Sequence, residues 1–103
     1  MKRREIGEQA WNRATRAALA EVLARIDDPA TMDAFLDDLC TPAELEALAD
    51  RWSVVPLLAQ GTPYRAIHER TGVSVTTIGR VARCLEHGAG GYRAALRHTG
   101  APA

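Results

Sequence analysis

The stretch from residue 62 to residue 87, TPYRAIHERTGVSVTTIGRVARCLEH, contains the patterns that decide the fold. Thr62-Pro63 has the form of a helix cap followed by a proline in the first turn. It predicts a short helix that runs to about Arg70 and turns Ala66 and Ile67 inward.

Gly72 should end this helix, because glycine readily adopts the left-handed conformation found after helix ends. Ser74 is a preferred N-cap residue and predicts a second helix over residues 75–86. We expect Ile78 to lock the two helices together, and the inner face continues through Leu85 and Val81 or Ala82. Two short helices joined by a turn with glycine are typical of a helix-turn-helix.

The second helix of this motif enters the major groove of DNA with its first residues against the base edges. Val75, Thr76 and Thr77 are short enough for close approach, and their methyl and hydroxyl groups can contact thymine methyls, bases or phosphates. The free amides at the helix start also favour a phosphate. The expected DNA-binding residues are Arg65, His68, Val75, Thr76, Thr77, Gly79, Arg80 and Arg83. Of these, Arg65, Arg80 and Arg83 would contact phosphates, whereas His68 is either a phosphate contact or an exposed bystander.

Charge is unevenly distributed, although the net charge is zero. Residues 27–50 contain eight acidic residues and neither lysine nor arginine. From Thr62 onward, six arginines stand against two glutamates, a balance of +4. A basic C-terminal part attracts phosphate, although a solvated charged face is an alternative explanation.

The remaining sequence is also helical in pattern. Residues 4–26 carry apolar side chains at steps of three and four, which predicts a long helix. Asp28-Pro29 predicts a cap and first turn for a second helix with Met32, Phe35, Leu36 and Leu39 on one face. Thr41 and Glu44 form a capping-box pattern that starts a third helix, which should stop at Gly61. Its inner face is expected to carry Leu45, Leu48, Trp52, Val55 and Leu58 or Ala59.

Pro56 interrupts the pattern of this third helix. A proline inside a helix removes one backbone hydrogen bond, so we expect the helix to continue with a kink.

The fold class is therefore all-α, with five to six helices in one domain of residues 1–103. Residues 1–61 should supply dimerisation helices, residues 62–86 the helix-turn-helix, and residues 87–103 a turn followed by a short helix or tail. Cys40 and Cys84 have no paired spacing, and no secretion signal or membrane-length apolar run is present. These features favour a cytoplasmic protein with reduced thiols.

Two longer stretches resemble a known family. DAFLDDLCTPAELEALADRW and YRAIHERTGVSVTTIGRVARCLEHGAGGY are similar to the tryptophan-repressor superfamily, in particular its YerC/YecD-like branch. The shared signatures are DDLCT and R-V-x-R-C-L-x-x-G-x-G-G-Y, and the resemblance covers roughly residues 30–98. It implies an intertwined homodimer that binds two-fold-symmetric operator DNA as a transcriptional regulator, most simply as a repressor.

The resemblance also implies a possible effector pocket for tryptophan or another amino acid as corepressor. The matching positions are Arg51, Arg80 and Thr41, the last from the other subunit. Two departures, Val81 and Cys84, fall where the ligand's ring and ammonium group would lie and would make the pocket smaller and less polar. We therefore favour the alternative in which Arg51 pairs with an acid, Asp50 or Glu44, and Arg80 holds a DNA phosphate.

Other functions have weaker support in the sequence. His68, Cys84 and His87 lack the paired spacing of a structural zinc site, so no metal is expected. No catalytic triad or phosphate-binding loop is recognisable, which argues against an enzyme. The remaining rival is a helical scaffold that binds a protein partner, without DNA, through the GAGGY turn and the acidic surface.

Overall fold

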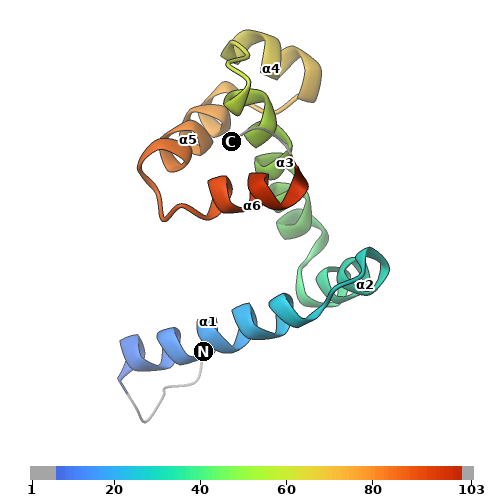
Figure 1. Cartoon of the computed structure of the whole chain (residues 1–103), viewed down its shortest axis with the longest axis vertical. Helices are drawn as coiled ribbons and strands as arrows, with labels where there is room; N and C mark the ends of the chain where they lie inside the picture. Colours follow the sequence, from blue (N-terminus) through green and yellow to red (C-terminus); the bar gives the residue numbers. More distant parts are fainter. Residues whose placement is uncertain (1–6, 101–103) are drawn as a thin grey trace. The chain divides into compact units, whose positions relative to one another are not determined.

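The computed structural model describes residues 7–100, which form six α-helices and no strand. The chain divides into two compact units, with the boundary between Thr41 and Pro42 (Figure 1). The all-α class is thus confirmed. The boundary lies well before residue 61, so the third helix belongs to the same unit as the helix-turn-helix.

The first unit contains α1 (Glu8–Arg25) and α2 (Pro29–Leu39). The predicted start of the long helix, residues 4–6, lies outside the described residues. α2 begins as the sequence predicts: the Asp28 carboxylate accepts a hydrogen bond of 2.9 Å from the Thr31 amide, and Pro29 is the first helical residue. No residue of α1 or α2 is buried within a single chain.

The second unit contains α3 (Pro42–Ala59), α4 (Tyr64–Thr71), α5 (Val75–His87) and α6 (Gly91–Thr99). α3 packs against both α4 and α5, and α6 packs against α5. The core that these helices enclose consists of Val54, Val55, Ile67, Val73, Ile78, Val81, Leu85 and Leu96. Burial of these eight apolar side chains gives the second unit a hydrophobic core of its own.

α3 differs in detail from its predicted inner face. Val54 is fully buried although the pattern did not include it, while Leu48 remains 41% exposed. The reason is that α4 and α5 cover the C-terminal half of α3, where two neighbours widen the buried stripe. The helix continues through Pro56 as predicted, and the kink expected at this position stays a prediction.

The start of α4 corrects one prediction. Pro63 itself is the N-cap residue, with an extended backbone (ψ 150°), and no side chain caps the helix. Thr62 therefore does not act as the predicted cap. Its amide instead donates to Leu57 O at 3.0 Å and so joins the end of α3.

After the turn that follows α5, the chain forms the predicted short helix, because α6 spans Gly91–Thr99. Both cysteines are free thiols, as expected. None of the helices within residues 7–100 combines the length and apolar character needed to cross a lipid bilayer.

Candidate nucleic-acid interface

The turn between α4 and α5 is held by a local hydrogen-bond network. Gly72 adopts a left-handed conformation with φ 77°, which explains the choice of glycine. The Thr71 hydroxyl donates to Ile67 O at 2.7 Å and accepts from the Val73 amide at 3.1 Å. These hydrogen bonds give partners to backbone groups at the end of α4 and fix the direction in which α5 starts.

His68 has a structural role that the sequence did not reveal. Its ring nitrogen Nδ1 donates to Val73 O at 2.7 Å, across the same turn. The side chain is therefore not a bystander: it braces the connection from α4 to α5. Contact with a phosphate remains a prediction for its other ring nitrogen.

The start of α5 is capped as predicted. The Ser74 hydroxyl oxygen accepts from the Thr77 amide at 3.1 Å, and the same hydroxyl donates to Thr77 Oγ1 at 3.1 Å. Thr77 is thus half-buried and already engaged within the cap. Val75, with 53% of its surface exposed, and the exposed Thr76 face solvent.

The two faces of α5 are sharply different. The inner face buries Ile78, Val81, Ala82 and Leu85, as the sequence predicts. On the outer face, Arg80 and Arg83 are exposed and Gly79 is partly so; Arg65 is exposed on α4. α5 therefore presents short side chains at its first turn, followed by the Arg80 guanidinium about one turn further on and that of Arg83 about two turns further on.

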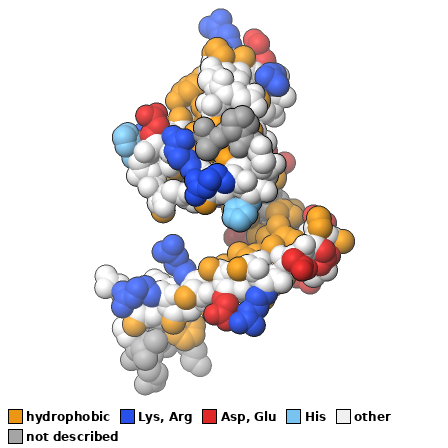
Figure 2. All heavy atoms as spheres, viewed as in Figure 1, with side chains coloured by type: hydrophobic (Ala, Val, Ile, Leu, Met, Phe, Trp, Pro, Cys, Tyr) orange, Lys and Arg blue, Asp and Glu red, His pale blue; other side chains and the backbone are white. Residues whose placement is uncertain are grey.

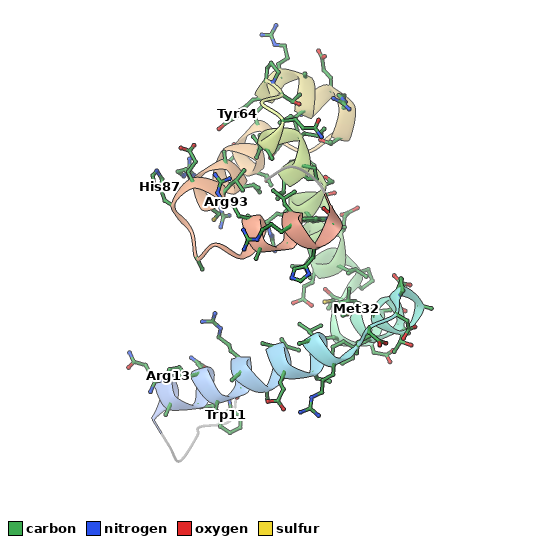
Figure 3. All side chains as sticks on the ribbon, in the orientation of Figure 1. Trp11, Arg13, Met32, Tyr64, His87 and Arg93 are labelled. Atoms are coloured by element: carbon green, nitrogen blue, oxygen red, sulfur yellow. The ribbon has the colours of Figure 1, made fainter. Side chains whose placement is uncertain are left out.

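Two of the proposed effector residues, Arg51 and Arg80, line different hollows. Arg51 lines a hollow of about 270 Å³ together with Asp50, Ser74 and Thr77. Arg80 and Cys84 line a different, shallow hollow of about 210 Å³ with Arg83 and His87. Of these four residues, His87 is labelled in Figure 3. Val81 lies in the core with 1% of its surface exposed.

The ion pair expected of Arg51 is not formed with Asp50. Within residues 7–100, no salt bridge joins these two side chains. Thr41 is exposed and is the last residue of the first unit. Across the same described range, no group of three or more histidine, cysteine or acidic side chains is arranged to hold a metal ion.

Comparison with known proteins gives a consistent picture. The family model of the Trp repressor protein matches residues 14–99. YerC of Bacillus subtilis (strain 168), an uncharacterized protein, is 47% identical over 62 residues, which span 60% of each chain.

Two solved structures share the fold. A Trp repressor-like protein of Staphylococcus aureus superposes with a TM-score of 0.80 at 30% identity, over 86% of this chain and 89% of that one. A TrpR-like protein of Eubacterium eligens ATCC 27750 gives a TM-score of 0.70 at 33% identity, over 89% and 90% of the two chains. With its helix-turn-helix in place and most of its length matched by the family model, this chain belongs to the Trp repressor family.

Proposed function

We propose that this chain is a sequence-specific transcriptional regulator that binds operator DNA as a homodimer and represses by occupying it. The observation that carries the proposal is the outer face of α5, where Val75 and Thr76 are exposed above a fixed, capped helix start. A helix that presents short side chains in this way can approach base edges closely. Membership of a family of helical DNA-binding regulators supports the same conclusion.

Arginines placed next to this face would supply the phosphate contacts. Arg65, Arg80 and Arg83 are all exposed, and no ion pair engages them within residues 7–100. Guanidinium groups that are free of acids bind phosphate oxygens without first breaking an internal contact. Arg80 is assigned to DNA rather than to tryptophan, because it lines a different hollow from the one that Arg51 lines and the neighbouring Val81 belongs to the core.

Dimerisation is proposed from the first unit. Figure 2 shows apolar side chains at its surface, and none of the residues of α1 or α2 is buried. Trp11, Leu19, Val22 and Leu39 each keep more than a third of their surface exposed. Such a face is stable in water only when another apolar surface covers it, and a second copy of the chain offers the same face.

Salt-dependent binding to a random-sequence duplex tests the proposal. The wild-type chain should bind, and its affinity should fall steeply with rising salt because phosphate contacts release counterions. Replacing Arg83 with Gln should weaken binding and reduce the slope of log affinity against log salt by about one unit. Arg25→Gln is the matched control, because Arg25 is exposed on α1 and pairs with Glu21 at 3.4 Å.

The control should bind like the wild type. An equal loss of DNA affinity in Arg83→Gln and Arg25→Gln would mean that only the overall charge of the protein determines DNA binding. No binding at low salt would favour the alternative of a protein-binding scaffold and contradict the proposal.

A further inference from the structure

A third hollow of the helix-turn-helix unit lies away from the outer face of α5. It has a volume of about 500 Å³, within the range of roughly 300–1,000 Å³ that small-molecule sites occupy. It lies where the end of α3, the start of α4, the second half of α5 and the start of α6 meet. None of the residues assigned above to DNA or to a corepressor lines it.

The lining combines an apolar wall with a few charged groups. Leu58, Pro63 and Leu85 supply apolar surface, and Tyr64 adds an aromatic ring that is 43% exposed. Figure 3 labels Tyr64, at the start of α4, and Arg93, on α6. An exposed aromatic side chain beside an apolar wall suits a ligand with a ring-sized body.

Arg93 is held in place as a binding group would need to be. Its Nε donates to Leu85 O at 3.1 Å, which anchors the guanidinium against α5. Within residues 7–100 its terminal amino groups form no ion pair, although Glu86 lines the same hollow. A guanidinium fixed in this way can take a carboxylate through two parallel hydrogen bonds.

Glu86 limits the charge that the ligand can carry. A carboxylate in the same hollow repels a second negative charge, so a dianion such as a phosphate monoester is disfavoured. We propose that this hollow binds a small organic monocarboxylate with an apolar, ring-sized body, with Arg93 on the carboxylate and Tyr64 beside the ring. The site is independent of the DNA-binding function proposed above, and its test requires no DNA.

The test is titration of the full chain with 3-phenylpropanoate, followed by the amide signals of each residue in NMR spectra. The amides of residues 61, 62, 64, 85, 86 and 93 should shift. Phenethylamine, which has the same ring but a positive charge, should not bind. Phenyl phosphate should bind more weakly than 3-phenylpropanoate. The Glu86→Gln variant should reduce this difference in affinity between the two ligands.

Variants assign the binding to one hollow. Arg93→Gln should weaken binding of 3-phenylpropanoate at least tenfold, since a hydrogen-bonded charge contact is lost. Arg93→Lys, which keeps the charge but not the planar fork, should lie in between and serves if the first variant unfolds. Arg51→Gln and Arg80→Gln are controls, because these residues line the other two hollows, and they should bind as the wild type does.

Three outcomes would overturn the proposal. One is binding that survives unchanged in Arg93→Gln. Another is loss of binding in Arg51→Gln or Arg80→Gln, which would place the ligand in a different hollow. The third is equal binding of phenethylamine, which would show that the ring alone is recognised.

Discussion

Thr76 and Thr77 are adjacent in the sequence, yet the structure gives them different environments. Thr76 is exposed at the first turn of α5, while the hydroxyl of Thr77 is bonded to Ser74 within the cap. From the sequence alone, both threonines are expected to contact DNA in the same way. The sequence does not show which of two adjacent threonines is exposed and which one joins the cap. A substitution at Thr76 therefore separates recognition from stability more cleanly than one at Thr77.

Replacing Thr76 with Glu should weaken DNA binding at least tenfold, because a carboxylate would face bases and phosphates. Exposed substitutions usually change stability by less than about 0.5 kcal/mol, so the melting temperature should stay nearly constant. Fluorescence anisotropy with labelled duplex and thermal unfolding measure the two effects. Unchanged DNA affinity would show that the first turn of α5 does not meet the groove.

Asp28 offers a prediction on pH. The hydrogen bond from the Thr31 backbone amide, followed by the bond from the Thr31 side chain, holds the pKa of the Asp28 carboxyl below its usual value. The cap therefore contributes stability above the unfolded-state pKa and loses it as pH falls through the lowered value. Carboxyl-carbon NMR should place the Asp28 midpoint below the ordinary pKa of an aspartate. A midpoint at or above the ordinary pKa would contradict the cap, and Asp28→Asn should keep α2 while removing this titration.

At the scale of the helices, much of the fold could be predicted because caps and stops are local. Asp28-Pro29, Gly72 and Ser74 mark helix ends through bonds within a few residues, and all three predictions are confirmed. Predictions that depend on contacts between residues far apart in the sequence were less accurate. The missed burial of Val54 and the bracing role of His68 depend on how α3, α4 and α5 meet.

Candidate site residues divide in the same way. The exposure of Val75 and the burial of Ile78 follow from helical periodicity, so the sequence was sufficient for them. Periodicity could not show that Arg51 and Arg80 line separate hollows, because that depends on tertiary packing. Arg93 was missed altogether: nothing in the sequence indicates that its side chain reaches back eight residues to Leu85 O.

Gly79 provides a test at the scale of α5. A Cβ added there would meet only the end of the Arg83 side chain, at 3.8 Å. Gly79→Ala should therefore stabilise the protein by about 0.5–1 kcal/mol, since alanine favours a helix interior. If this glycine allows close approach to DNA, the same variant should bind duplex at least threefold more weakly. Stabilisation without any loss of binding would remove Gly79 from the interface.

Gly88, the C-cap residue of the same helix, is the control for which the opposite change in stability is expected. A Cβ at this position would collide with the carbonyl of Cys84. Gly88→Ala should therefore lose about 1 kcal/mol or more in denaturant unfolding. Similar stabilities for the two alanine variants would mean that the packing around α5 is not as described.

At the scale of the whole molecule, the two units differ in how they are stabilised. The unit from Pro42 onward encloses a core, whereas α1 and α2 bury no residue in a single chain. A unit that ends at Thr41 is also close to the lower length limit at which a domain buries enough surface alone. The stability of the first unit should therefore depend on association and on protein concentration.

Val22→Glu tests this dependence, because Val22 is 41% exposed on α1. A charge in an apolar interface is costly, so the variant should shift the mass in sedimentation equilibrium from dimer towards monomer. Asn12→Glu adds the same charge at an exposed polar position of α1 and should remain dimeric. A wild-type chain that is monomeric at micromolar concentration would contradict the proposed assembly.

The most direct test of the central claim is selection of bound duplexes from a random-sequence library by the wild-type chain. If two copies of α5 read the major groove, the enriched sequences should be two-fold symmetric, with half-sites about 34 Å apart. The Thr76→Glu variant should fail to enrich them. Enrichment of no sequence by the wild type, or of the same sequences by Thr76→Glu, would contradict the account.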